Sequence, residues 1–154
     1  MRTILLGALG LLLLAPAVQA QDWELEPTFG SVELSEGFLP DPHEVTLTAG
    51  GDTVPAVPGC EYGNIAPAPD YDVYYETSGG TTLYIYAVSG SDTTILVNTP
   101  GQAWACDDDS FADGDPLVII PNAAAGRYDI WVGTYDGDAS EAVLFISEVD
   151  PRGN

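Results

Sequence analysis

The chain has 154 residues, no lysine and a formal net charge of −21, because 24 acidic side chains oppose only three arginines. A surface of that sign repels phosphate backbones and anionic lipid headgroups, so the charge argues against nucleic-acid binding and adsorption to membranes. We weigh two explanations for the acidity: a solubility or salt adaptation spread over the surface, and carboxylates that converge on a divalent cation.

The first twenty residues have the features of a secretory signal peptide. Arg2 provides a basic start, Ile4 to Leu14 form an apolar run, and Val18-Gln19-Ala20 is a small-residue cleavage site. The run is about half of the ~20 residues that span a bilayer, so a retained membrane helix is the weaker alternative. We expect a secreted protein, extracellular or periplasmic, with one domain over residues 21–154 and no membrane insertion after removal of the signal peptide.

Short runs rich in Val, Ile, Thr and Tyr alternate with Gly and Pro, and no segment keeps helical periodicity for three turns. This pattern predicts an all-β protein of about eight strands, which suits a sandwich or jelly roll. The predicted strands are 32–34, 44–48, 71–77, 81–88, 93–98, 116–120, 127–135 and 142–148. The proline-rich stretch 21–69 is expected to supply long connections that wrap the sandwich.

Turn sequences separate the predicted strands of the second half. Ser78-Gly79-Gly80 and Ser89-Gly90-Ser91-Asp92 each lie between two strands, and Asp136-Gly137 is a strong hairpin signal before strand 142–148. We therefore expect a series of connected antiparallel strands in this half of the chain.

Side chains alternate along the predicted strand 127–135, so it has two distinct faces. One face carries Trp131 and Tyr135, which would form an exposed aromatic strip and so a binding surface for sugars. The alternative, which we favour, is that they pack under a loop or a sheet edge, because large aromatic side chains are usually buried. The core face is expected to carry Tyr128, Ile130, Val132 and Thr134.

Several catalytic and metal-binding chemistries lack the residues they need. His43, the only histidine, lies in a proline-rich stretch where we expect it to be solvated, and no Gly-x-Ser-x-Gly nucleophile accompanies it. One histidine and two cysteines do not supply a zinc site, and a chain without lysine has no Gly-x-x-x-x-Gly-Lys phosphate loop. We expect no catalytic activity, although 24 acids form many pairs and a hydrolase based on one acidic pair stays an alternative.

Cys60 and Cys106 are the only two cysteines. In a secreted chain this favours a disulfide over a metal site or a catalytic thiol. Closing a loop of that length stabilises a fold by roughly 4 kcal/mol. The alternative is two buried, unpaired thiols.

The densest group of carboxylates is predicted to lie in a loop with the sequence Cys106-Asp107-Asp108-Asp109-Ser110-Phe111-Ala112-Asp113-Gly114-Asp115. Ca²⁺ prefers hard oxygen ligands at this density, and three consecutive aspartates repel one another without a cation. The spacing is not that of an EF-hand, which needs different residues at Phe111, Ala112 and Val118. The alternative is a solvated acidic loop.

Three stretches within about residues 70–148 together resemble a known family. They are Asp92-Thr93-Thr94-Ile95-Leu96-Val97, Trp104-Ala105-Cys106-Asp107-Asp108-Asp109-Ser110 and Gly126-Arg127-Tyr128-Asp129-Ile130-Trp131-Val132-Gly133-Thr134-Tyr135. An Asp-Thr-x-Leu strand, an Asn/Asp-Asp-Asp loop and an Ala/Ser-Gly-x-Tyr strand are the pattern of the bacterial pre-peptidase C-terminal domain.

The resemblance implies a non-catalytic antiparallel β-sandwich of jelly-roll type, which in that family is appended to secreted hydrolases and binds Ca²⁺ and substrate polymers. It places Ca²⁺ ligands on Asp107, Asp108 and Asp109 of the loop and on Asp92 of the preceding strand. The cysteine pair is not a general feature of that family.

The sequence thus predicts a secreted, Ca²⁺-stabilised binding or accessory module whose partner is an extracellular polymer or a secreted protein. Two alternatives stay open. One is a cell-surface assembly protein in which Ca²⁺ bridges acidic faces of neighbouring subunits, and the other is the hydrolase with an acidic pair.

Overall fold

A computed structural model describes residues 20–153, so the predicted signal peptide lies outside the described residues except for Ala20. Within this range no helix has the length and hydropathy needed to cross a bilayer. The described residues form nine strands: β1 (Ser31–Ser35), β2 (His43–Ala49), β3 (Tyr71–Glu76), β4 (Leu83–Ser89), β5 (Thr93–Asn98), β6 (Trp104–Asp107), β7 (Leu117–Ile120), β8 (Gly126–Thr134) and β9 (Ser140–Ser147).

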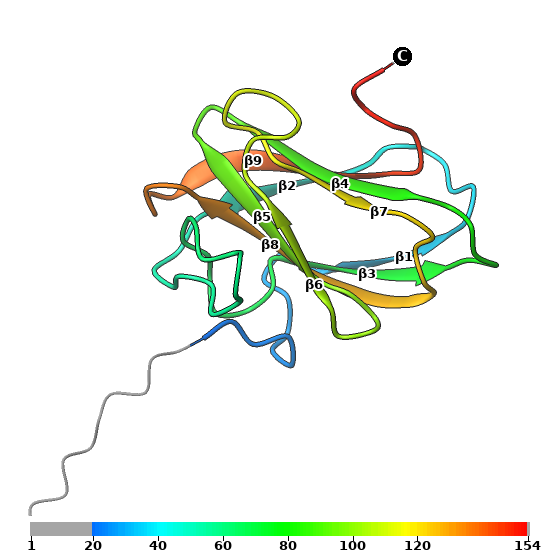
Figure 1. Ribbon diagram of the computed structural model, residues 1–154, viewed down its shortest axis with the longest axis horizontal. Helices are drawn as coiled ribbons and strands as arrows, with labels where there is room; N and C mark the ends of the chain where they lie inside the picture. The colour runs from blue at the N-terminus through cyan, green and yellow to red at the C-terminus, as the bar shows by residue number, and fades with distance from the viewer. Residues whose placement is uncertain (1–19, 154) are drawn as a thin grey trace, which may run out of the picture.

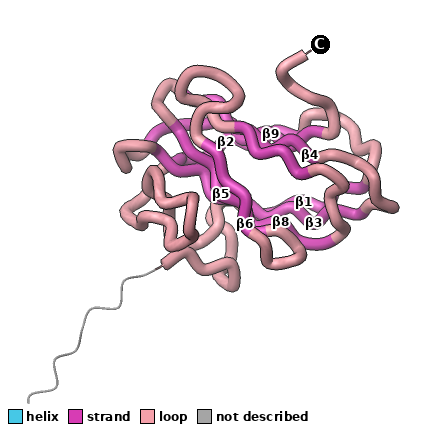
Figure 2. Tube along the Cα trace, in the orientation of Figure 1, coloured by secondary structure: helices cyan, strands magenta, loops and turns pink. Residues whose placement is uncertain are grey.

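The strands form two sheets that pack on each other as a β-sandwich (Figure 1). The order is β1-β3-β8-β5-β6 in the five-stranded sheet and β2-β9-β4-β7 in the four-stranded sheet. Neighbouring strands are antiparallel except β1 and β3, which are parallel. Figure 2 shows the sheets as two layers with loops gathered at their ends. The predicted all-β sandwich is confirmed, with the eight predicted strands and one more.

The main core lies between the two sheets, because each strand turns alternate side chains inward. On β8 the predicted core face is confirmed: Tyr128, Ile130, Val132 and Thr134 are each at most 1 % exposed. Burial of aliphatic side chains of this size stabilises a fold by roughly 1.5–3 kcal/mol each. The four-stranded sheet contributes Leu47, Ile85, Leu144 and Ile146 to the same core.

The sequence does not predict strand β6, because Trp104–Asp107 contains no β-branched residue and its second half belongs to the predicted acidic loop that begins at Cys106. It pairs with β5 as a hairpin, and the amide of Thr99 donates to the carbonyl of Ala103 at 2.9 Å in the turn. Pairing with a buried neighbour, rather than intrinsic propensity, makes this segment a strand.

The hairpin predicted at Asp136-Gly137 is wrong. A turn does form, since Gly137 N donates to Thr134 O at 3.3 Å and Thr134 Oγ1 donates to Asp138 O at 2.9 Å. However, β3 and β5 already occupy both edges of β8, so the chain crosses to the other sheet and β9 pairs with β2 and β4. The connections from β3 to β4 and from β4 to β5 also change sheets.

A candidate binding groove on the five-stranded sheet

A second apolar cluster covers part of the outer face of the five-stranded sheet. Trp131 of β8 lies in it and is 0 % exposed, with its ring centroid 5.7 Å from that of Trp104. The exposed aromatic strip is therefore contradicted for Trp131, and the favoured alternative, burial under a loop, is confirmed. Tyr135 is 58 % exposed, but Trp131 does not join it in an exposed strip. The other buried members of the cluster are Val57, Cys60, Ile65 and Leu96.

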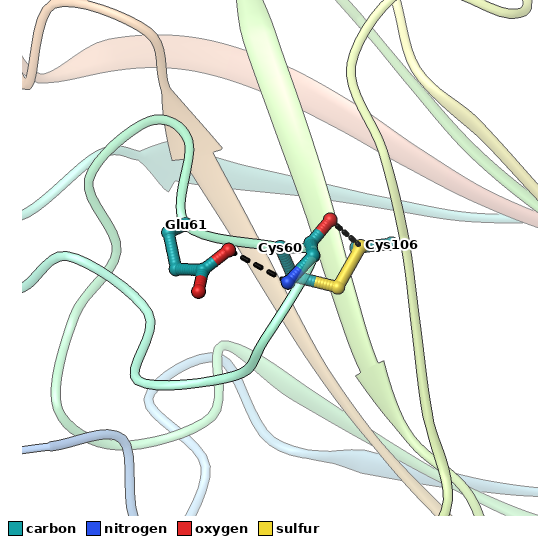
Figure 3. The surroundings of a disulfide bond; sticks show 4 residues. Cys60, Glu61 and Cys106 are labelled. Carbon is teal, nitrogen blue, oxygen red and sulfur yellow. Dashed lines mark hydrogen bonds between the residues drawn. A yellow bond between two sulfur atoms is a disulfide. The ribbon is translucent and has the colours of Figure 1, made fainter.

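A disulfide between Cys60 and Cys106 joins the covering loop to β6 (Figure 3). The two Cα atoms are 5.8 Å apart, and neither cysteine is free, which confirms the predicted bridge. Beside the bridge, the carboxylate of Glu61 accepts a hydrogen bond of 2.6 Å from the amide of Gly59. Such a bridge is typical of proteins from oxidising compartments.

The outer face of the same sheet also holds an open groove of about 690 Å³ beside β1, β3 and the start of β8. Tyr74 of β3 lines this groove and is 42 % exposed. An exposed tyrosine ring offers a partner an apolar surface and a polar hydroxyl. The side chains of Glu33, Ser35 and Glu76 line the groove with it.

The strand register places two carboxylates next to the ring of Tyr74. Glu33 of β1 is its register partner on the neighbouring strand, and Glu76 lies two residues farther along β3 on the same face. Both glutamates are exposed, and Ser35 Oγ donates to Glu76 Oε2 at 3.4 Å. An aromatic ring beside two solvated carboxylates, with Arg127 as its register partner on β8, is therefore the main chemical feature of the groove.

A second cavity of about 340 Å³ continues from the groove past Ala125 and Gly126, which line both spaces. Gly126 has φ +136°, and a Cβ there would lie 2.7 Å from Pro100 Cβ, so a larger residue does not fit. This cavity is also lined by Trp23, Asn98, Arg127 and Asp129.

Asp72 of β3 and Asp129 of β8 form an acidic pair at the base of this region. They are register partners on neighbouring strands, and each is 2 % exposed. Burial, followed by the charge of Asp129, raises the pKa of Asp72 to about 7. Burial also raises the pKa of Asp129, and Arg127, whose Nε lies 2.8 Å from Asp129 Oδ1, opposes that rise.

Arg127 also fixes the segment before β1 over the sheet. Its Nη2 donates to the carbonyl of Trp23 at 2.8 Å, and Thr28 N donates to Pro69 O at 2.9 Å. The guanidinium is therefore engaged by Asp129 and by a backbone carbonyl. It is not available as a free anion-binding group.

The acidic loop is organised by Asp107, the last residue of β6. Its carboxylate accepts hydrogen bonds from Ser110 N at 2.8 Å, Ser110 Oγ at 2.6 Å and Leu117 N at 2.8 Å. Asp109 Oδ1 accepts one from Gly114 N at 3.1 Å. Asp107 therefore ties the end of β6 to the start of β7 through hydrogen bonds to protein donors.

The structure does bring the other predicted calcium ligands into one neighbourhood. Burial, followed by the charges of Asp109 and Asp108, raises the pKa of Asp92. Burial and the charges of Asp109 and Asp107 do the same for Asp108. Among residues 20–153, however, no three His, Cys, Asp or Glu side chains are arranged to hold a metal ion. Ca²⁺ binding therefore stays a prediction.

His43 is not the solvated loop residue that the sequence predicted. It is the first residue of β2, partly buried, with Nε2 3.1 Å from Tyr71 Oη and the two rings stacked at 5.9 Å. Burial lowers the pKa of His43. Its contact with Tyr71, which belongs to the other sheet, gives it a packing role.

Sequence reasoning missed the groove residues and the buried acidic pair. Tyr74 and Asp72 lie on the outer face of a correctly predicted strand, but their partners Glu33 and Asp129 come from strands far away in sequence. The alternation of side chains along 71–76 indicates the outer face of this strand, because it separates Asp72, Tyr74 and Glu76 from the core residues.

No protein-family model and no curated protein matches this sequence. Similar solved structures include PliG of Aeromonas hydrophila, a periplasmic lysozyme inhibitor of g-type lysozyme, with 17% identity, a TM-score of 0.45 and coverage of 77% of this chain and 96% of that chain. The pre-peptidase C-terminal domain of a Bacillus anthracis collagenase is similar with 13% identity, a TM-score of 0.46 and coverage of 80% and 99%. The latter is a domain of the kind that the sequence resembles. Similarity at this level assigns neither partner nor activity to this chain.

Proposed function

We propose that this chain is a secreted, non-catalytic binding module that holds an extracellular polymer or another secreted protein in the groove beside Tyr74. The observation that carries the proposal is the 42 % exposure of Tyr74 in an open groove of about 690 Å³. Tyrosine is enriched at binding surfaces because it offers a large contact area and loses little conformational freedom. The disulfide supports a role in an oxidising compartment.

The position of the acidic pair supports a non-catalytic role. A general acid or a nucleophile must come within hydrogen-bond reach of the substrate. Asp72 and Asp129 are each 2 % exposed, and Asp129 contacts Arg127. We therefore assign the pair to the support of the sheet beneath the groove.

The test is a titration of the ¹⁵N-labelled chain, followed by amide chemical shifts, with four soluble probes: cello-oligosaccharide, chito-oligosaccharide, a collagen-derived peptide and hexalysine. We expect at least one probe to shift the amides of Tyr74, Glu76 and Gly126 and to leave that of Tyr135 unchanged. Shifts confined to the four-stranded sheet, or none with any probe, would contradict the proposal.

Ca²⁺ binding at the acidic loop is a separate proposal, and it rests on charge. The charges of Asp108 and Asp109 oppose ionisation of Asp92, so a divalent cation between them would relieve the repulsion. Titration calorimetry of Ca²⁺ into chelator-treated protein should show heat and a rise in melting temperature, both reduced in Asp92→Asn. Absence of both effects would contradict Ca²⁺ binding at the loop and would not bear on the proposed binding in the groove.

A further inference from the structure

We infer that the groove takes lysine or arginine side chains of a cationic polypeptide segment. This inference rests on the proposed binding function and names the class of partner. It is carried by the acidic lining of the groove, the exposed ring beside two carboxylates and an unpartnered buried amide in the adjoining cavity.

The charges around Tyr74 are almost all negative. On one side the groove is lined by Glu33 and Glu76. On the other side, Tyr74 lines a smaller cavity of about 150 Å³ together with Glu24 and Glu26, both exposed. The cation beside these residues is Arg127, the register partner of Tyr74 on β8, and it is engaged by Asp129 and by the carbonyl of Trp23. An anionic partner would meet uncompensated repulsion here, whereas a cationic partner would be attracted.

The spacing of the carboxylates suits a long cationic side chain. Neighbouring strands are about 4.8 Å apart, and residues two apart along a strand are separated by about 7 Å, so both Glu33 and Glu76 lie within one side-chain length of the Tyr74 ring. An ammonium or guanidinium over the ring gains a cation–π contact and charge-assisted hydrogen bonds to carboxylate oxygens. A neutral sugar would gain only the stacking contact.

The adjoining cavity adds a feature that favours a polypeptide. Asn98 is 3 % exposed and lines this cavity, and its Nδ2 has no hydrogen-bond acceptor among the described residues. A buried donor without an acceptor is destabilising, so an incoming acceptor that reaches it would be bound favourably. A peptide backbone whose side chain occupies the groove carries carbonyl acceptors on either side of that side chain.

The charge of the whole chain points to the same partner. A net charge of −21 attracts basic polypeptides over long range and repels a second copy of this chain. Long-range attraction alone would be diffuse, however, and it would not depend on particular side chains. Binding in the groove should instead depend mainly on the carboxylates of Glu33 and Glu76 and on the ring of Tyr74.

The experiment measures binding of hexalysine and hexa-arginine by calorimetry, with a neutral Gly-Ser hexapeptide as the control ligand. The groove variant Glu33→Gln/Glu76→Gln is compared with Glu44→Gln/Glu141→Gln, which removes the same charge from exposed positions on β2 and β9. We expect hexalysine affinity to fall about tenfold in the groove variant and by less than about threefold in the control.

The ring is tested by two further substitutions at Tyr74. Tyr74→Phe keeps an aromatic face, whereas Tyr74→Leu keeps much of the bulk without it. We expect Tyr74→Leu to weaken hexalysine binding by roughly three- to fivefold and Tyr74→Phe to retain most of it. Thermal melts of each variant check that these exposed substitutions leave the fold intact.

Equal losses in the two double variants would overturn the inference, because attraction would then be diffuse. Equal binding by Tyr74→Leu and Tyr74→Phe would also overturn it. If an oligosaccharide shifts the groove amides and hexalysine does not, the cationic partner is wrong and the proposed binding function stands. If no probe binds at the groove, both fail.

Discussion

Asp72 and Asp129 are register partners on the neighbouring strands β3 and β8, and both are buried, each 2 % exposed. Arg127 contacts Asp129 and donates to the carbonyl of Trp23, and Tyr74 is the register partner of Arg127. The buried pair is therefore connected through one guanidinium to the segment over the sheet and to the exposed ring of the groove. Its protonation state bears on the stability of the surface proposed to bind a partner.

Stability should decrease as pH rises toward neutrality. Burial raises the pKa of Asp70 to about 7, and Asp72 reaches about 7 as well. The folded chain keeps these protons where the unfolded chain has released them, so the free energy of unfolding falls as pH rises from about 4 to about 7 and then levels off. Urea unfolding between pH 5 and pH 8 measures this fall.

Asp70→Asn should reduce that pH dependence. Asp70 Oδ2 accepts a hydrogen bond of 2.7 Å from Val132 N, which an amide oxygen can also accept. Between pH 5 and pH 8, the fall in unfolding free energy should be smaller by roughly 2–3 kcal/mol in the variant. Glu141→Gln, at an exposed position on β9, is the control and should leave the pH profile unchanged. A profile that Asp70→Asn does not alter would show that Asp70 is ionised across this range.

Removal of the disulfide should destabilise the chain by about 4 kcal/mol, because the bridge closes a loop with a sequence separation of 46. The measurement compares urea unfolding of Cys60→Ser/Cys106→Ser with that of the parent chain. Tryptophan fluorescence should also change in the native state, since Trp104 and Trp131 pack in the cluster that contains Cys60. A difference below about 1 kcal/mol would contradict a major role of the bridge in stability.

Asp107→Ala should destabilise the chain both with and without Ca²⁺. The substitution leaves the amides of Ser110 and Leu117 without their acceptor, at a cost of roughly 2–3 kcal/mol. Asp109→Ala loses one exposed hydrogen bond and should cost less than about 1 kcal/mol. If the loss at Asp107 is seen only with Ca²⁺ present, Asp107 acts as a metal ligand and the structural assignment is wrong.

Trp131→Ala and Tyr135→Ala should differ strongly, although the two residues lie close together in the sequence. Trp131 is 0 % exposed, and its truncation leaves a cavity that should cost about 3–5 kcal/mol. Tyr135 is 58 % exposed, and its truncation should change stability by less than about 0.5 kcal/mol. Thermal or urea unfolding measures both, and similar values would mean that Trp131 is not covered.

The elements whose alternation is local could be predicted from the sequence. The core face of β8 is one such case, because its pattern lies within a single strand. The disulfide could also be predicted, since only two cysteines are available. Strand β6 and the path after Asp136 could not, because each depends on which strand edges are already occupied.

The groove could not be predicted for the same reason. Glu33 and Tyr74 become neighbours only through the parallel pairing of β1 with β3, and nothing in the local sequence specifies that register. Trp131 was ambiguous because alternation assigns it to the outer face, while the segment that covers this face comes from an irregular loop. Coverage of an outer sheet face is a long-range property.

Tyr74 is the centre of the proposed binding surface. The direct measurement is the dissociation constant of the tightest-binding probe for Tyr74→Ala and for Tyr135→Ala. Arg127, the register partner of Tyr74, lies about 26 Å along the β8 region from Tyr135. Tyr135 is therefore an exposed tyrosine that is distant from Tyr74. We predict a loss of at least about tenfold for Tyr74→Ala and a change within about twofold for Tyr135→Ala. Equal affinities for the two variants would contradict the proposal that the partner binds at Tyr74.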